Sequence, residues 1–238
     1  MKIEVLFPEF ANLYGDLQNI KYLKLCIKDL EVIETKYHDE PYFVNHDDVD
    51  MLYMGPMTER SQSLLVEKLM PYNARLEELI EKGVVALFTG NALELFGEYI
   101  QNEDESKIEC LGIFKTHAER RMLARYNENA YATIGDVEVC AFVSTFSRSY
   151  GDNENNYLFD VKIGTGINAE SKKEGLRKNN FMGTYYVGPI LCINPQFTKY
   201  LLNLLSVKLD KLPFEDIMQE AFEQRLSEFK AYAEKHNN

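Results

Sequence analysis

The sequence predicts an α/β protein with a Rossmann-like (flavodoxin-like), mainly parallel sheet, helices on both of its faces, and a β-rich second half. Three observations predict this fold. Short apolar runs alternate with amphipathic helical patterns through the first 100 residues. One run, residues 84–88, is wholly apolar, as expected of a strand that is buried on both faces. Beyond about residue 130, strand-like segments are joined by turns rich in Gly, Asn and Asp.

In the first half, strands and helices alternate. The expected strands are residues 2–7, 31–36, 50–54 and 84–88. A helix is expected between the first two, from Asp16, which can cap it, to about Leu30. Helical spacing resumes from Glu59 to Lys82, where Pro71 should kink or split the helix and Gly83 should end it. This alternation is typical of a parallel sheet that is covered on both faces.

In the second half, strands dominate until helices return near the C-terminal end. The expected strands are residues 131–134, 137–143, 157–163 and 181–187. Helices are expected at 195–206 and 214–235. The sequence contains no repeats, low-complexity tracts or long linkers. One domain over residues 1–238 is therefore the simplest expectation.

The bulk composition excludes several classes of protein. A formal net charge of −12 disfavours nucleic-acid binding, because such a surface repels a phosphate backbone. No apolar stretch approaches the roughly 20 residues of a membrane helix, and the N-terminus lacks a signal-peptide pattern, so we expect a cytosolic protein without a membrane partner. The four cysteines and four histidines are scattered, so neither a metal site nor a cofactor is expected.

The segment Phe88-Thr89-Gly90-Asn91-Ala92-Leu93-Glu94-Leu95-Phe96-Gly97 carries the main functional signal. An apolar strand that runs into a tight turn and then a helix is where many α/β enzymes place a nucleophile. The turn lifts one side chain above the sheet, and the free N–H groups of the next helix can stabilise an oxyanion. The plain alternative is an ordinary strand-to-helix connection. Asn91 is expected to help the tight turn, since asparagine tolerates left-handed backbone.

This segment resembles the nucleophile elbow of class I glutamine amidotransferases of the cobyric acid synthase and lipid II isoglutaminyl synthase type, which reads Gly-Ile-Cys-Gly-Gly-Tyr-Gln-Leu-Leu-Gly. Five further segments resemble the same family in the same order. They are Leu6–Ile20, Gly55–Gln62, Leu111–Phe114, Gly164–Gly175 and Gly183–Leu191. The resemblance covers roughly residues 3–205 and implies the amidotransferase fold.

The resemblance also implies that the residues of glutamine hydrolysis are missing. The overlay places Gly90, or Thr89 after a shift by one residue, where the family has its cysteine, and Val187 where it has its histidine. A threonine nucleophile needs a base, which Val187 cannot be. His117 lies in a run of polar residues that is expected at the surface. Pro56 replaces a glycine of the family, so a backbone N–H that could serve an oxyanion is absent as well.

Several polar residues that match the family remain. Those expected to bind a ligand are Tyr14, Asp16, Asn19, Gly55, Glu59, Arg60 and Gln62. Two of these expectations have a structural alternative. Asp16 is at least as well explained as a helix cap, and Glu59 with Arg60 as an ion pair in a first helical turn.

The resulting hypothesis is an amidotransferase-like protein without glutaminase activity. The resemblance implies a Mur ligase-like, ATP-using partner protein and a role in cell-wall precursor or amide metabolism. This chain has no P-loop pattern, so any use of ATP would lie in the partner. The alternatives are an active glutamine amidotransferase with a non-standard nucleophile such as Thr89 or Cys110, and a module that binds a small polar, glutamine-like ligand.

Overall fold

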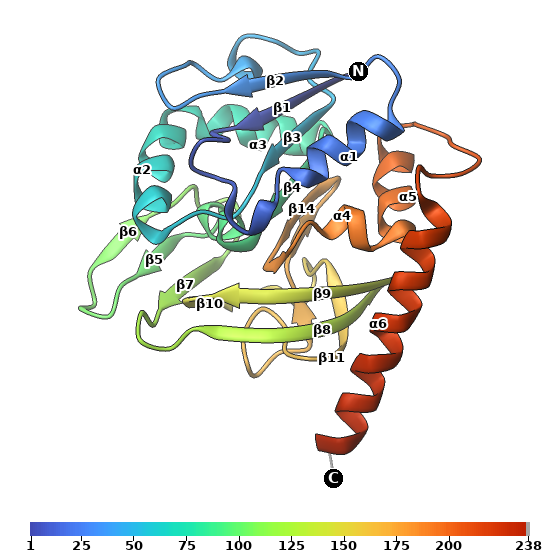
Figure 1. Cartoon of the computed structure of the whole chain (residues 1–238). Coiled ribbons are helices and arrows are strands. Elements are labelled where there is room, and N and C mark those ends of the chain that lie inside the picture. The colour runs from blue at the N-terminus through green and yellow to red at the C-terminus, as the bar shows by residue number, and fades with distance from the viewer. Residues whose placement is uncertain (237–238) are drawn as a thin grey trace.

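In the computed structural model, which describes residues 1–236, a six-stranded sheet forms the centre of the first half (Figure 1). Its strands lie in the order β13-β14-β4-β3-β1-β2. Their bounds are β1 Lys2–Leu6, β2 Glu31–Thr35, β3 Met51–Met54, β4 Val85–Thr89, β13 Leu176–Lys178 and β14 Phe181–Thr184. All neighbours pair in parallel except β13, which is antiparallel to β14. The predicted parallel sheet is confirmed, and β4 is one of its two central strands.

The helices of the first half cover the two faces of this sheet. Helix α1 (Gln18–Cys26) connects β1 to β2, which lies on one side of β1. Helices α2 (Glu59–Leu69) and α3 (Asn73–Glu81) connect β3 to β4 in the opposite direction. Right-handed connections therefore place α1 on the other face from α2 and α3, as Figure 1 shows. The carboxyl ends of β1 and β3 meet where the strand order reverses, which is where open α/β sheets bind ligands.

Local sequence explains the breaks between these helices. The short 3₁₀ turn Met70–Tyr72 separates α2 from α3, because Pro71 cannot donate the hydrogen bond that a continuous helix needs. Gly83 has a φ of +78° and ends α3, as predicted. Two other short 3₁₀ turns lie in loops, at Leu13–Gly15 and Tyr42–Val44.

The second half contains two further sheets. One has four strands in the order β10-β7-β5-β6, and the other has five in the order β12-β11-β8-β9-β15. Their bounds are β5 Tyr99–Gln101, β6 Lys107–Glu109, β7 Thr116–Arg120, β8 Tyr126–Ile134, β9 Val137–Thr145, β10 Ser147–Gly151, β11 Phe159–Ile163, β12 Lys173–Glu174 and β15 Tyr186–Val187. The β-rich second half was predicted, but β5, β6, β7 and β10 were not. Their many polar residues obscure the alternation of apolar and polar residues that indicates a strand.

Residues 181–187 were predicted as one strand, and this was wrong. The segment contributes β14 to the parallel sheet and β15 to the antiparallel one, with Tyr185 between them. The buried Glu174 carboxylate explains the break. It accepts hydrogen bonds from the Tyr185 N–H at 2.8 Å and the Thr184 hydroxyl at 2.8 Å, so the strand cannot continue its own ladder there.

The chain ends in three helices, α4 (Ile190–Ile193), α5 (Pro195–Leu204) and α6 (Glu215–His236). The last two occupy the predicted positions within one or two residues. Figure 1 shows α6 running from the first half down along β8, β9 and β11. Within residues 1–236, no helix is long and apolar enough to cross a membrane. One cluster of buried apolar side chains joins the parallel sheet, the antiparallel sheets and the C-terminal helices.

Candidate functional site

The elbow is the sharp turn at Gly90, between β4 and the 3₁₀ segment Gly90–Phe96. Gly90 has a φ of +59°, a conformation that residues with a side chain rarely adopt. A helix from Ala92 to about Phe96 was expected after the turn, and the structure forms it as a 3₁₀ helix over Gly90–Phe96. The connection is short and stops at Gly97, and such connectors commonly form the tighter 3₁₀ turn.

No space is left for a side chain at Gly90. A Cβ atom built there would lie 2.5 Å from the Pro56 Cβ and 3.1 Å from the Val187 Cγ1. The first distance is a clash with a rigid ring. Val187 therefore lies beside Gly90, where the overlay with the family places its histidine, and together with Pro56 it fills the position of a nucleophile.

Thr89 does not point to this position. It is the last residue of β4 and fully buried, and its hydroxyl donates a hydrogen bond to the Asp16 carboxylate. The Asp16 carboxylate also accepts from the Tyr53 hydroxyl, and all three side chains are fully enclosed by protein. Thr89 therefore acts as a buried hydrogen-bond donor under the elbow.

Asp16 is a buried acceptor and not a helix cap, so the preferred structural alternative was wrong. The N-cap of α1 is Leu17, and no side chain caps the helix there. The Asp16 carboxylate instead accepts from the hydroxyls of Thr89 and Tyr53. Burial raises the pKa of Asp16, and hydrogen bonds from Thr89 and Tyr53 and the nearby Gly188 backbone oppose this rise.

One oxygen of this carboxylate is unsatisfied. The buried Oδ1 atom of Asp16 has no partner with hydrogen-bond geometry, although Gly188, the neighbour of Val187, is close enough to influence the carboxylate. An acid in that place could orient a histidine at position 187 by accepting its ring N–H. In this structure the oxygen remains unpaired, and such an unpaired buried oxygen costs stability.

Asn19 and Gly55, both expected to bind a ligand, serve the packing around this acid. Asn19 is buried, donates to the Tyr53 hydroxyl at 3.2 Å and accepts from the Leu191 N–H at 2.9 Å. It thereby fastens α1 to α4. A Cβ at Gly55 would lie 2.6 Å from the Ala11 carbonyl oxygen, so this position needs glycine for a close backbone approach.

Asn91 joins the elbow to the loop before α2. Its side-chain oxygen accepts from the Met57 N–H at 3.0 Å, and its side-chain nitrogen donates to the Met57 carbonyl at 2.9 Å. The Asn91 amide thus bonds both backbone groups of Met57, as a residue on a neighbouring β-strand would. These bonds hold the loop so that Pro56 packs against Gly90. Asn91 therefore positions the loop in addition to its predicted role in the tight turn.

Gln62 belongs to a buried polar network below the elbow. Its amide nitrogen donates to the Asn91 carbonyl at 2.7 Å and to Glu94 at 2.8 Å, and its oxygen accepts from the Arg120 guanidinium at 2.7 Å. Glu94 also accepts from the hydroxyls of Ser147 and Tyr185. Burial raises the pKa of Glu94, and these donors oppose the rise. Gln62 is thus enclosed by protein and faces no cleft.

Residues 116–121 were expected to lie at the surface, and this was wrong, because Arg120 belongs to the buried network. Strand β7 buries Thr116, Ala118 and Arg120 and leaves His117 half-buried on its other side. His117 stacks on Tyr99 with ring centroids 4.8 Å apart. It faces away from the network that Arg120 enters, so it is not a base for the elbow.

A pocket of about 250 Å³ opens beside the elbow. It is lined by Leu13, Tyr14, Pro56, Met57, Thr58, Glu59, Asn91, Arg125, Ser144, Thr145 and Phe146. Of the expected ligand-binding residues, only Tyr14 and Glu59 line it, and Asn91 of the elbow lines it as well. Arg60 is exposed outside it, and within the described chain Glu59 and Arg60 form no ion pair. The expected ion pair in the first turn of α2 is therefore absent from residues 1–236.

Arg125 is the site residue that the sequence did not reveal. It stacks on Phe146 at 4.6 Å and donates to the Tyr14 hydroxyl at 3.2 Å, and that hydroxyl contacts the Ser144 side chain at 3.1 Å. Tyr14 has a φ of +60°, so its backbone is strained into this position. The pocket thus presents one cation and one tyrosine hydroxyl, which suit a ligand carboxylate. The arginine lies in a turn before β8, and nothing in its local pattern distinguishes it.

Comparison with known proteins supports the predicted resemblance and fold. The sequence model of the CobB/CobQ-like glutamine amidotransferase domain matches residues 2–193. Two relatives are lipid II isoglutaminyl synthase (glutamine-hydrolyzing) subunits GatD. The one from Staphylococcus aureus (strain N315) is 29% identical over 205 residues, covering 86% of this chain and 83% of the relative. The one from Streptococcus pneumoniae (strain ATCC BAA-255 / R6) is 26% identical over 241 residues, covering 96% and 88%.

Solved structures share the fold at low identity. PurLQS from Thermotoga maritima superposes with a TM-score of 0.58 at 12% identity, covering 86% of this chain and 98% of that one. The glutaminase domain of Trypanosoma brucei CTPS, solved with bound acivicin, superposes with a TM-score of 0.51 at 8% identity, covering 90% and 96%. From its match over residues 2–193, the chain belongs to the family of CobB/CobQ-like glutamine amidotransferase domains.

Proposed function

We propose that this chain is a glutamine amidotransferase-like subunit that does not hydrolyse glutamine. It acts in the cytoplasm beside a Mur ligase-like, ATP-using partner, in cell-wall precursor or amide metabolism. The partner part of the proposal is supported by the two GatD relatives, each of which is by its name a subunit of a lipid II isoglutaminyl synthase.

The observation that carries the proposal is the closed elbow. Hydrolysis needs a nucleophile about 3 Å from the amide carbon and a base to activate it. Position 90 has no side chain, position 187 has no proton acceptor, and a Cβ at Gly90 would meet Pro56 at 2.5 Å. Loss of either member of such a pair costs orders of magnitude in rate, because the two act as a unit.

The pocket beside the elbow supports a binding role. Its volume of about 250 Å³ suits a ligand of amino-acid size. Arg125 and the Tyr14 hydroxyl would hold a carboxylate, and Glu59, which also lines the pocket, would attract an ammonium group. A small polar, glutamine-like ligand is thus bound but not cleaved.

The alternative, an active amidotransferase with another nucleophile, has little support. The Thr89 hydroxyl is fully buried, its hydrogen bond goes to the equally buried Asp16 carboxylate, and Thr89 does not line the pocket. Burial raises the pKa of Cys110 to about 12, so its thiol stays protonated at neutral pH. Cys110 also lies outside the residues that line the pocket.

The chemistry is tested by measuring glutamate release from glutamine by the purified chain, alone and with any ligase that co-purifies with it. We expect no release above background, and no adduct in mass spectrometry after exposure to an electrophilic glutamine analogue. Robust turnover that Thr89→Val or Cys110→Ser abolishes would contradict the proposal and identify the nucleophile.

Ligand binding is tested separately, by the shift in melting temperature that glutamine or glutamate causes. We expect a shift that Arg125→Ala and Tyr14→Phe each reduce. Arg60→Ala is the matched control, because it removes an arginine that is exposed outside the pocket. An equal loss of the shift in the control would contradict this assignment of the pocket.

A further inference from the structure

One face of the molecule combines exposed apolar side chains with lysines, although the protein is strongly acidic. It is formed by α1, the loop between α5 and α6, and the start of α6. The exposed apolar residues are Leu25 at 60%, Leu209 at 38%, Phe214 at 66% and Ile217 at 69%. The lysines are Lys21, Lys24, Lys28, Lys208 and Lys211. We call these nine residues the α1–α6 patch.

Contacts between the elements place these residues together. The Tyr22 hydroxyl of α1 donates to the Pro213 carbonyl at 2.7 Å and contacts the Met218 sulfur at 2.9 Å. Phe214 and Ile217 are the chain neighbours of these two partners. Leu25 lies one helical turn beyond Tyr22, on the side of α1 that borders this contact. The three exposed apolar side chains therefore surround one junction.

Three exposed lysines lie on α1 and in the turn that follows it. Lys21 and Lys24 are three residues apart and lie on one side of the helix, and Lys28 lies in the turn just beyond its last residue, Cys26. Within residues 1–236, their ammonium groups make no hydrogen bond or ion pair, and the same holds for Lys208. Lys211, in contrast, pairs with Asp216 at 2.5 Å. Four cations are thus available to an external partner.

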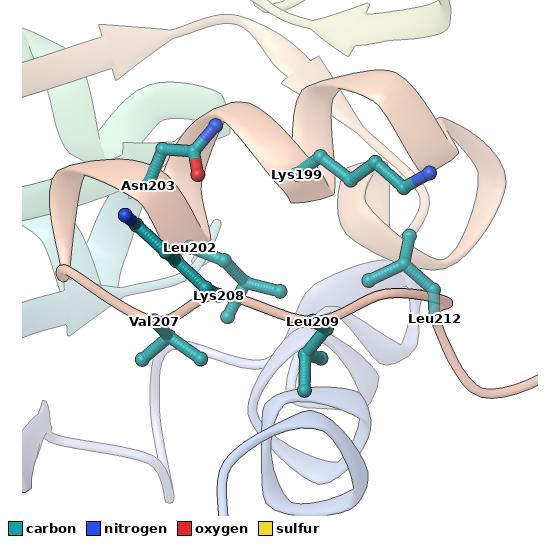
Figure 2. A pocket seen from close by; sticks show the side chains of 7 residues that line it. All are labelled: Lys199, Leu202, Asn203, Val207, Lys208, Leu209 and Leu212. Carbon is teal, nitrogen blue, oxygen red and sulfur yellow. The ribbon is translucent and has the colours of Figure 1, made fainter.

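A hollow of about 250 Å³ adjoins the loop of the patch (Figure 2). Leu202, Val207 and Leu212 give it apolar walls, and the side chains of Lys199 and Lys208 extend to opposite sides of it in this view. An apolar recess with cations at its edge can accept a hydrocarbon chain while the ammonium groups remain in water.

We propose that the α1–α6 patch docks on the surface of an anionic lipid bilayer. Phe214, Ile217 and Leu25 would enter the headgroup region, and the unpaired lysines would attract lipid phosphates. Of the acidic residues in the same segments, Glu215 pairs with Lys199 and Asp216 with Lys211, which leaves Asp29 and Asp210 against the four unpaired lysines. Salt screens the remaining negative charge of the protein where it lies more than about 10 Å from the bilayer. Such peripheral docking needs no membrane-spanning helix. It also does not depend on the chemistry of the elbow or on the proposed ligase partner.

The test is sedimentation of the full chain with vesicles of phosphatidylglycerol and phosphatidylcholine. We expect binding to anionic vesicles, none to pure phosphatidylcholine, and a steep decrease with salt. The triple variant Lys21→Gln, Lys24→Gln, Lys28→Gln should weaken binding roughly 100-fold, since each lysine near such a surface contributes about fivefold. Phe214→Ser with Ile217→Ser should also weaken it, but without changing the salt dependence.

The matched control is Lys36→Gln, Lys115→Gln, Lys162→Gln, which changes the net charge equally at exposed lysines outside the patch. It should bind like the wild type. Equal weakening in the control would overturn the proposal, because the attraction would then be unspecific. Absence of binding to anionic vesicles would also overturn it. So would a concentration-dependent dimer that Phe214→Ser with Ile217→Ser dissociates, because a second copy would then cover the patch.

Discussion

The elbow and the polar side chains beneath it differ in what each contributes to the folded chain. At the elbow, Gly90, Pro56 and Val187 provide no reactive atom and no room for one. Beneath it, Gln62 and Glu94 belong to a network in which each makes several hydrogen bonds. A nucleophile and its base add little to stability, so they can be replaced without unfolding the protein. A buried polar group cannot be, because its partners would be left unpaired.

The largest effect should follow from breaking the network below the elbow. Glu94→Ala removes the acceptor of Gln62, Ser147 and Tyr185 and removes a carboxyl group that interacts with Arg120. We expect the free energy of unfolding, measured in urea, to fall by about 3–5 kcal/mol. Glu59→Ala, on the rim of the pocket, should change it by less than about 0.5 kcal/mol. A loss below about 1 kcal/mol for Glu94→Ala would mean that the network is dispensable.

The next largest effect concerns Glu174, the support between β14 and β15. Burial raises its pKa from 4.5 to about 7, so the folded state binds its proton more tightly than the unfolded chain. The stabilisation that the protonated Glu174 carboxyl gives the folded state is complete below pH 4.5 and is lost as the pH rises through 7. The free energy of unfolding falls by about 3 kcal/mol over this range. Urea unfolding at pH 5 and pH 8 should show a smaller decrease for Glu174→Gln than for the wild type. Equal decreases in the wild type and the variant would mean that a group other than Glu174 causes the pH dependence.

At the elbow itself, the clash between positions 56 and 90 can be measured. Gly90→Ala should cost about 2 kcal/mol, because its φ is positive and its new methyl group meets Pro56. Pro56→Gly removes the obstructing ring, so the double variant should lose less than the sum of the two single variants. Strict additivity of the free energies of unfolding would show that Pro56 does not close the site.

The smallest effect should come from the link between the elbow and the loop before α2. Asn91→Ala removes two hydrogen bonds to the Met57 backbone and should lower the free energy of unfolding by about 1–2 kcal/mol. Asn203→Ala, at an exposed asparagine in the last turn of α5, should have almost no effect. If both variants unfolded at the same urea concentration, Asn91 would not hold the loop in place.

The sequence predicts the parallel sheet and the elbow well, because their signals are local. An apolar strand, a glycine and a run of small residues are adjacent in the chain, so the turn at Gly90 could be located without its surroundings. Asp16 could not be interpreted in this way. A helix cap and a buried acceptor look alike locally, and its partners Tyr53 and Thr89 lie 37 and 73 residues away.

Two arginines show the same limit. Arg120 alternates with His117 and Glu119 in a polar run, and only its pairing with Gln62, 58 residues earlier, makes it a buried residue. Arg125 enters the pocket because β8 and β9 bring it to Tyr14, 111 residues away. Contacts over such separations depend on how the sheets pack, and no spacing rule in one sequence encodes them.

At Tyr185 the chain passes from the parallel sheet into the antiparallel one. This passage couples the opening of backbone hydrogen bonds in the two sheets. Residues 181–184 are paired with β4 in the parallel sheet, and residues 186–187 with β9 in the antiparallel one. One residue is too short a connection for either sheet to come apart while the other stays closed. In deuterium exchange, the amides of Met182 and Val187 should therefore share one protection factor and exchange in a single cooperative event.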